Sequence, residues 1–231
     1  MNRVDGLHHL AICTANMKSQ IEFFTDVLGM ELVALYWMHG VPNTWHGFLR
    51  LNDESSIAFV CNPGIEKIPV ELGKTHAGNP GANCARGVMQ HVALRVKDHA
   101  ALLAMRDRIR SKGVPVLGPL DHGFCQSIYF AGPENLSLEL SYSLEAIDAQ
   151  AWIDPEVVKL AGISPHELAR YKRSTDFADQ KGRVHQPALD GPGPHMTNYP
   201  KGGYEQLLSL SDEAVLARSE NQPPVKVAAR N

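Results

Sequence analysis

Hydrophobic and polar positions follow the same pattern twice along the chain. Each copy opens with a short strand-like run, at 7–12 in the first and 89–94 in the second. A segment with apolar residues at helical spacing follows each run, at 19–28 and at 100–111. Gly29 and Gly113 stand directly after these segments, where a left-handed residue commonly ends a helix. The two halves of the pattern therefore begin alike, with a strand and then a helix.

Three strand-like runs follow each predicted helix. They occupy 31–37, 45–52 and 56–61 in the first copy, and 114–117, 124–130 and 136–141 in the second. The stretch 63–86 between the copies is rich in Gly, Pro and Asn, which is typical of a connecting loop. We therefore predict an α+β fold of two tandem βαβββ modules, a first module at 1–62 and a second at 87–143, joined by a linker at 63–86.

The remaining residues, 144–231, break this pattern. Asp154-Pro155 predicts a short helix through 160, and Ser164 with Glu167 forms a capping box that opens another helix through 173. A further helix is possible at 211–218, whereas 182–204 is dense in Gly and Pro, and the residues from 220 onward are predicted to be disordered. We expect an irregular, partly helical C-terminal extension that wraps the core or a partner subunit.

Composition excludes several classes of function. Hydrophobic residues make up 44% of the 231 residues, which is enough for a proper core. With 22 basic and 25 acidic residues the net charge is -3, which favours neither nucleic acid nor an anionic membrane as a partner. The first ten residues contain no apolar signal-peptide core, no run is long enough to span a bilayer, and the four cysteines form no C-x-x-C pair. We expect a cytoplasmic protein without a disulfide framework.

Three residues could hold a metal ion. His9 and His91 open equivalent strands of the two copies, 82 positions apart (91 − 9), so pseudo-symmetry could bring the two imidazoles together. Glu139 lies in an apolar strand, where a buried carboxylate is costly without a partner. A histidine in a strand is more often a packed core residue, but the repeated position and Glu139 favour a metal. Two imidazoles and one carboxylate form the triad that suits non-haem Fe(II).

The sequence resembles the vicinal oxygen chelate superfamily. The run His9-Leu-Ala-Ile and the later Leu28-Gly29 are similar to the opening of these proteins. Residues 132–140 resemble the family's D-P-D-G-N-x-[IL]-E-L close, with departures that include Gly132 for the first Asp and Asn135 for the Gly. The resemblance covers 5–143. It implies paired modules that form an incomplete barrel around a divalent metal.

A longer resemblance distinguishes groups within this superfamily. Glyoxalase-type members carry a fourth ligand on the last strand of the first module, but the 82-residue offset from Glu139 leads to Ile57. The stretch from His122 through Tyr129 to Glu139 resembles type I extradiol dioxygenases instead. That resemblance implies Fe(II)-dependent cleavage of a catechol-like aromatic with O₂. A histidine titrates near neutral pH, so His122 is the candidate base, and Tyr129 is the candidate hydrogen-bond donor to the substrate.

Four further residues are candidates for binding the substrate: His8, His39, Trp45 and His46. The last three lie in an aromatic and polar hairpin, although aromatic residues in strands more often belong to the core. A histidine at position 8, beside His9, also resembles the hydroquinone-cleaving dioxygenases, so a hydroquinone substrate stays open.

Two other classes of function stay open at this point. One is a non-redox lyase or isomerase of the glyoxalase type that uses Mn, Zn or Ni, and the other is a small-molecule-binding protein without catalysis. In each case we expect a small aromatic ligand rather than a macromolecule. The exposed strand edges of an open barrel also predict a homo-oligomer.

Overall fold

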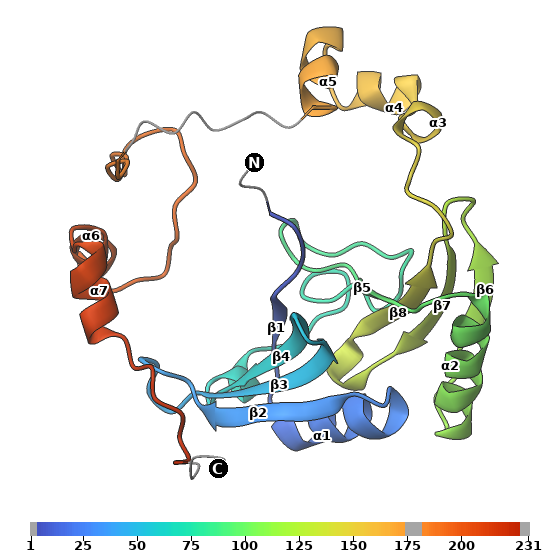
Figure 1. The fold of residues 1–231 in the computed structure, drawn as a ribbon, viewed down its shortest axis with the longest axis horizontal. Helices are drawn as coiled ribbons and strands as arrows, with labels where there is room; N and C mark the ends of the chain where they lie inside the picture. The colour runs from blue at the N-terminus through green and yellow to red at the C-terminus, as the bar shows by residue number, and fades with distance from the viewer. Residues whose placement is uncertain (1–3, 174–181, 227–231) are drawn as a thin grey trace, which may run out of the picture. The chain divides into compact units, whose positions relative to one another are not determined.

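The structure, a computed structural model, describes residues 4–173 and 182–226 (Figure 1). It divides into a unit at 5–162, which contains the strands and helices of both predicted modules, and a second unit that comprises Val4 and the described residues from 163 onward. The predicted module boundaries at 62, 87 and 143 remain a prediction, since this division falls elsewhere.

Two four-stranded sheets of the same topology form the first unit. The first sheet has the order β1-β4-β3-β2 and the second the order β5-β8-β7-β6. In each, the first and last strands of the module run parallel and the other neighbours antiparallel. The predicted α+β duplication is confirmed, as two sheets rather than a closed barrel among the described residues. The strands are β1 (His9–Cys13), β2 (Glu31–Trp37), β3 (Trp45–Asn52), β4 (Ser55–Cys61), β5 (Val92–Arg95), β6 (Leu117–Asp121), β7 (Gln126–Ala131) and β8 (Ser137–Tyr142).

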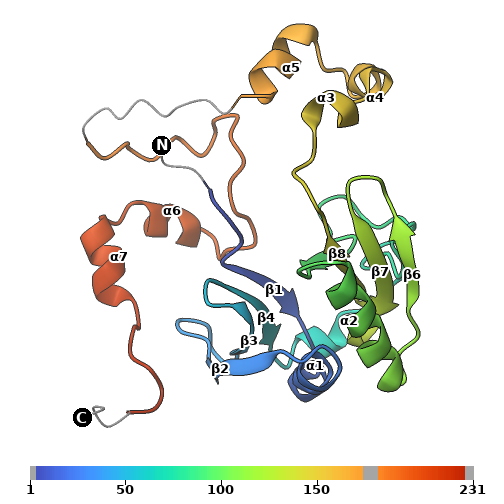
Figure 2. The ribbon, with the colours of Figure 1, turned by 45° about the vertical axis from the view of Figure 1, so that its right-hand side comes forward.

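One helical segment per module covers its sheet, as Figure 2 shows for α2. In the first module α1 (Met17–Glu22) continues into a π-helical turn, η1 (Phe23–Val27), and in the second α2 is a regular helix (His99–Ser111). Gly29 and Gly113 adopt positive φ of 78° and 82°, which confirms the predicted glycine ends. Nε–H of Arg108 in α2 donates a hydrogen bond to the carbonyl oxygen of Val27 at 2.8 Å. The second module therefore supplies a donor to a backbone carbonyl at the end of the first module's helical segment.

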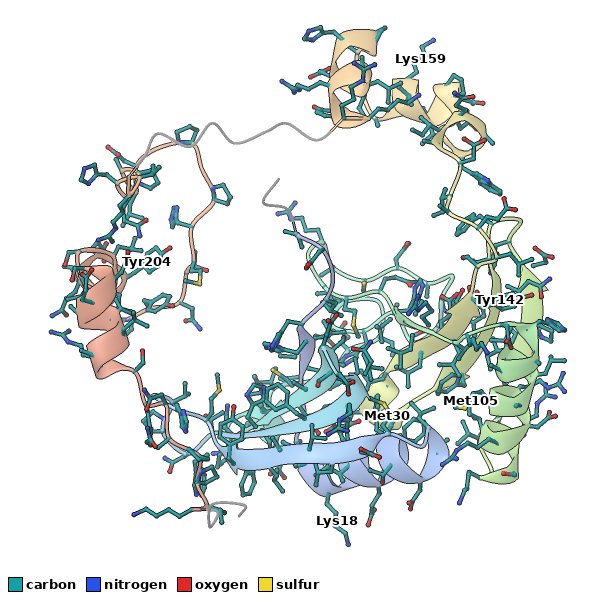
Figure 3. The ribbon with its side chains drawn as sticks, in the orientation of Figure 1. Lys18, Met30, Met105, Tyr142, Lys159 and Tyr204 are labelled. Carbon is teal, nitrogen blue, oxygen red and sulfur yellow. The ribbon has the colours of Figure 1, made fainter. Side chains whose placement is uncertain are left out.

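A single hydrophobic core joins the two modules. Its buried members come from both sheets and both helical segments, and Met30 and Met105, labelled in Figure 3, pack against it. The rings of Phe24 and Phe59 meet edge to face with centroids 5.1 Å apart. Each large side chain that is fully buried contributes about 1.5–3 kcal/mol. Those most deeply buried are Phe24, Phe59, Leu49, Ile57, Leu102, Ile109, Ile128 and Leu138.

The position of β6 differs from the prediction. The sequence predicted this strand at 114–117, whereas β6 spans Leu117–Asp121 and contains Pro119. Pro119 has no N–H to donate to a neighbouring strand. Since β6 is the outer strand of its sheet, and its pairing shifts between Leu117 and Leu120, the missing donor is tolerated there.

The residues after β8 form short helices. In the first unit α3 (Ala149–Trp152) was not predicted, and α4 (Pro155–Leu160) begins after its Asp154 cap as predicted. The second unit contains α5 (Pro165–Tyr171), α6 (Gly203–Leu208) and α7 (Asp212–Arg218), with the predicted capping box at the start of α5. The predicted disorder from 220 falls partly on 227–231, outside the described residues. In the described part of the chain, no helix has the length and apolar character needed to cross a bilayer.

Glu134 connects the two modules through a turn before β8. It lies in η3 (Pro133–Asn135) with a φ of 54°, and its carboxylate accepts bonds from Thr14 Oγ1 at 2.5 Å, the Ala15 amide at 2.8 Å and Gln20 Nε2 at 2.8 Å. Burial alone would raise the pKa of Glu134, but these three bonds together hold it below its ordinary value. The charged carboxylate therefore stabilises the junction between the modules.

Replacing Glu134 by Gln is expected to lower the free energy of unfolding by about 2 kcal/mol, because charge-assisted bonds to buried donors are lost. The contribution is fully present above the unfolded-state pKa and is lost as pH falls through the lower folded-state pKa. The urea-unfolding midpoints of the wild type and of Glu134→Gln should therefore differ at neutral pH and become equal in acid. The exposed Glu54→Gln is the control, and equal midpoints for Glu134→Gln and wild type at neutral pH would contradict this assignment.

Candidate functional site

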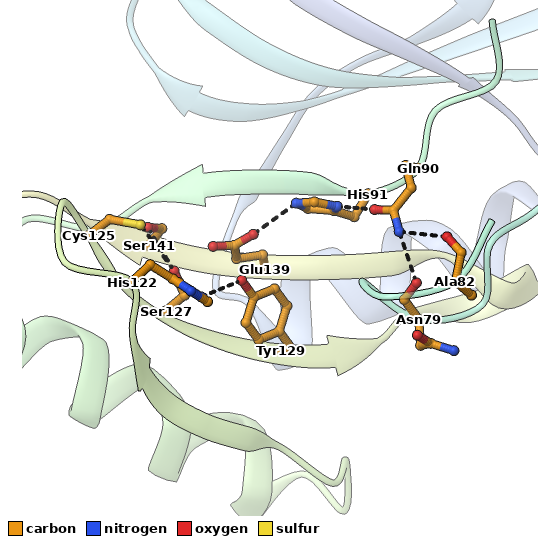
Figure 4. A network of polar contacts seen from close by, with 10 residues as sticks. All are labelled: Asn79, Ala82, Gln90, His91, His122, Cys125, Ser127, Tyr129, Glu139 and Ser141. Atoms are coloured by element: carbon orange, nitrogen blue, oxygen red, sulfur yellow. Dashed lines mark hydrogen bonds and ion pairs between the residues drawn. The ribbon is translucent and has the colours of Figure 1, made fainter. Parts of the chain in front are cut away.

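His91 and Glu139 lie side by side on the second sheet. β5 and β8 are parallel neighbours, and His91, directly before β5, places its Nε2 3.0 Å from Glu139 Oε2 (Figure 4). Glu139 is only 5% exposed, although it is a carboxylate. A buried carboxylate is costly unless a positive charge or donor accompanies it. Two of the three predicted metal ligands therefore face each other in a sheltered position.

His122 and Tyr129 adjoin this pair. Tyr129 is the direct neighbour of Glu139 across the antiparallel β7–β8 pair, and its hydroxyl lies 2.9 Å from Nε2 of His122, in the turn before β7 (Figure 4). Burial first, and then the negative charge of Glu139, raise the pKa of the Tyr129 phenol, so it stays protonated at neutral pH. His122 is exposed to solvent. The predicted catalytic pair is thus in hydrogen-bond contact beside the candidate ligands.

His9 lies in a different cluster. Its ring is 5.5 Å from Phe48 and 6.3 Å from His46, and its Nδ1 is 2.8 Å from Nδ1 of His8. Within 4–173 and 182–226, no group of three or more His, Cys, Asp or Glu side chains is arranged to hold a metal ion. The structure of one chain therefore brings together His91 and Glu139 but does not add His9 to them.

His39 and His46 belong to the cluster around His9. The His46 ring is 4.4 Å from Phe48 and 6.1 Å from Tyr36, which in turn meets His39 at 5.4 Å. His46 is 7% exposed, and its Nε2 has no hydrogen-bond partner among the residues that the structure describes. Burial, and to a smaller extent the charge of His9, lower the pKa of His46, so this ring is neutral at neutral pH. The cluster combines aromatic surface with a free imidazole nitrogen.

Trp45 does not join this cluster. It precedes His46 on β3, and alternate residues of a strand point to opposite faces. Its ring stacks on Trp37 at 5.6 Å, and it remains 41% exposed. The four predicted substrate residues therefore separate into His8, His39 and His46 near His9, and Trp45 on the other face.

The position of a fourth ligand is occupied by alanine. Leu10 pairs with Ile57 as Val92 pairs with Leu138, so the first-module counterpart of Glu139 is the following residue, Ala58. The sequence offset had led to Ile57, one residue away. Since Ala58 carries no donor atom, the expectation of a site without a fourth protein ligand is unchanged.

The turn that carries His122 is held by α3. Gly123 has a φ of +83°, and a Cβ at this position would lie 2.7 Å from the Trp152 ring. The Phe124 ring meets Trp152 edge to face at 4.9 Å, and the Gly123 amide donates to Asp121 at 2.8 Å. Trp152 therefore restrains both residues that follow His122.

Replacing Trp152 by Ala is expected to loosen this turn, because the ring that lies over Gly123 and packs against Phe124 is lost. Hydrogen exchange at 121–125 should become faster at the same time. Trp37→Ala, which removes an exposed tryptophan from the first sheet, is the matched control. Unchanged exchange in the turn of Trp152→Ala would show that Trp152 does not hold it.

Two polar residues at the site and its junction were missed from the sequence. Gln90 contacts His91 Nδ1 through its amide oxygen, and its Nε2 donates to the carbonyl oxygens of Asn79 at 3.1 Å and Ala82 at 3.0 Å (Figure 4). Only its position next to His91 could have drawn attention to it. Glu134 had a clearer signal, because it occupies an acidic position of the closing motif at 132–140.

One protein-family profile matches the sequence of both modules. The profile of the Glyoxalase/Bleomycin resistance protein/Dioxygenase superfamily matches residues 6–140, which is more than half of the chain. The chain therefore belongs to this superfamily.

Individual relatives share modest identity with the chain. The "Putative ring-cleaving dioxygenase MhqA" of Bacillus subtilis (strain 168) is 26% identical over 170 residues, which are 72% of this chain and 50% of that protein. The chain thus spans about half the length of this curated relative. A glyoxylase/bleomycin resistance protein/dioxygenase domain from Frankia sp. EAN1pec is 14% identical with a TM-score of 0.48, and covers 61% of this chain and 99% of its own. The fosfomycin resistance protein FosX of Listeria monocytogenes, solved with Mn(II), is 14% identical with a TM-score of 0.43, over 64% and 99%.

Proposed function

We propose that this chain is an Fe(II)-dependent dioxygenase that cleaves the ring of a catechol-like aromatic with O₂. The observation that carries the proposal is the row of contacting polar side chains on the second sheet, from His91 and Glu139 to Tyr129 and His122. The superfamily and the likeness to MhqA support the same class of chemistry.

The residues present fit a divalent metal. An imidazole nitrogen and a carboxylate oxygen 3.0 Å apart, in a sheltered position, are the donor types that suit Fe(II) in two-histidine, one-carboxylate sites. We assign His91 Nε2 and the Glu139 carboxylate as ligands. When bound, Fe(II) would supply open positions for the substrate oxygens and for O₂, and would pass electrons from the aromatic substrate, which is oxidised as both oxygen atoms enter it, to O₂.

We assign the third ligand to His9 of a second copy of the chain. Within one chain, the three bonds to Glu134 and the bond from Arg108 fix the modules relative to each other, with His9 in the His46 cluster. A second copy can present its first module to the second module of its partner. A symmetric pair would then contain two equivalent sites, each built from both copies.

The other polar residues have distinct roles in this proposal. His122 takes the proton of a substrate hydroxyl and exchanges it with solvent, to which it is exposed. Tyr129, kept protonated by burial and by Glu139, donates a hydrogen bond to a substrate oxygen. His8, His39 and His46 contribute an aromatic and imidazole surface for the ring of the substrate.

Oxygen uptake tests the proposed reaction. Protein loaded anaerobically with Fe(II) is mixed with a panel of catechols and hydroquinones, and O₂ consumption and ring-opened product are measured together. We expect consumption of O₂ with at least one vicinal diol or hydroquinone, and none with metal-free protein. An iron-replete sample that consumes no O₂ with any of them would exclude the reaction.

Subunit mixing tests the source of the third ligand. His9→Ala and Glu139→Gln are each expected to be inactive, but a hybrid pair contains one site with both native residues. Mixing the two variants under subunit exchange should therefore restore about a quarter of the wild-type activity. No recovery, with exchange demonstrated by mass spectrometry, would place His9 in the same chain or outside the site.

A further inference from the structure

Gln90 has a side chain whose orientation is fixed by its surroundings. Its Nε2 lies within hydrogen-bond distance of two backbone carbonyl oxygens, those of Asn79 and Ala82. A carbonyl oxygen can only accept, and only the nitrogen of an amide side chain can donate. The amide oxygen of Gln90 must therefore face His91.

This orientation determines which hydrogen His91 carries. An amide oxygen can only accept, so Nδ1 of His91 must be the protonated nitrogen that donates to Gln90. A neutral imidazole carries one hydrogen, so its Nε2 presents a lone pair. That lone pair points at Glu139 Oε2, another acceptor, from 3.0 Å. Acceptors on both sides of the ring require a cation at Nε2, either a proton or a metal ion.

We propose that Gln90 is a positioning residue for the metal: it occupies Nδ1 of His91 and thereby selects Nε2 as the coordinating nitrogen. The carbonyl oxygens of Asn79 and Ala82, in the linker between the modules, hold Gln90 in turn. Partners that accept from the second nitrogen of a ligating histidine orient the ring and raise its basicity. The inference rests on the metal site of the proposed function, but not on ring cleavage.

Two substitutions separate this role from a structural one. Gln90→Leu removes both the acceptor for His91 and the donors to the linker, whereas Gln90→Glu keeps an acceptor for Nδ1–H and loses the linker donors. Zinc, which has no redox chemistry, is the probe, and its affinity is measured by titration calorimetry. Gln206→Leu, in α6 of the second unit, is the control. Circular dichroism checks that each variant folds.

We expect Gln90→Leu to weaken zinc binding about 10–100-fold, and Gln90→Glu to stay within a few-fold of the wild type. In ¹⁵N-labelled zinc-bound wild type, NMR should show His91 protonated at Nδ1 and coordinated through Nε2, with slow exchange of the Nδ1 hydrogen. Exchange should become fast in Gln90→Leu only.

Each alternative result is decisive. An equal loss of zinc affinity in Gln90→Leu and Gln90→Glu would show that Gln90 only supports the linker. A wild-type zinc affinity in Gln90→Leu would show that Gln90 has no role in metal binding. Coordination through Nδ1 in the wild type would also overturn the inference. If Gln90→Leu does not fold, the NMR spectrum of the zinc-bound wild type and the zinc affinity of Gln90→Glu still test the inference. Protein that binds zinc as expected but never consumes O₂ when loaded with iron would leave Gln90 in place and refute only the ring cleavage.

Discussion

Glu139→Gln is expected to lose metal binding and, with it, all ring cleavage. The neutral amide cannot balance the charge of a divalent ion, and Glu139 is the only carboxylate that the structure describes next to His91 Nε2. Loss of a residue that merely supports a ligand costs about 10–100-fold in metal affinity, so loss of the ligand itself should cost at least about 100-fold. Iron content after anaerobic loading and desalting measures this directly.

The control for this variant is Glu54→Gln, which alters an exposed carboxylate in the turn between β3 and β4. Circular dichroism and urea unfolding establish that Glu139→Gln is folded. If the folded variant retained one iron per chain at the wild-type affinity, Glu139 would not be a ligand, and the assigned site would be wrong.

The second large effect is expected for His122→Ala, with kcat lower by about 10²–10⁴-fold at unchanged iron content. His122 lies beyond Tyr129, which stands between it and Glu139, so its removal deletes a proton acceptor without touching a ligand. Steady-state O₂ uptake at saturating substrate, with the iron content determined on the same sample, measures the effect.

Tyr129→Phe and His166→Ala complete this comparison. Tyr129→Phe keeps the ring and removes the hydroxyl, so it should lower kcat less than His122→Ala, because the proton acceptor is still present. His166→Ala removes an exposed histidine of α5 and should behave as wild type. A kcat for His122→Ala within twofold of the wild type would show that another group, or water, takes the proton.

Local pattern was sufficient for most of the fold. Alternating and helical apolar spacing predicted seven of the eight strands and both long helical segments, because burial on one face dictates those patterns. It was wrong for β6, since a strand at the edge of a sheet can accept Pro119, which the local pattern treats as a break. The short helices α3 and α6 were also not predicted.

The sequence could predict only those contacts of the candidate site that join residues on directly paired strands. Glu139 meets Tyr129 and His91 because their strands pair directly, and the spacing from His122 to Glu139 follows the same β7–β8 hairpin. The location of His9 depends on how modules are placed, which no local pattern encodes. Gln90 is held by backbone carbonyl groups of the linker. Every residue has such a carbonyl, so the sequence does not indicate which ones bind a side chain.

Crystals of the protein soaked with zinc, and an anomalous difference map at the zinc edge, test the shared metal centre most directly. We expect one peak per chain, about 2.0–2.2 Å from His91 Nε2 and a Glu139 oxygen, with His9 of a second copy as the third protein ligand. A fully loaded crystal whose peaks lie elsewhere, with His91 and Glu139 still bonded directly to each other, would contradict the account.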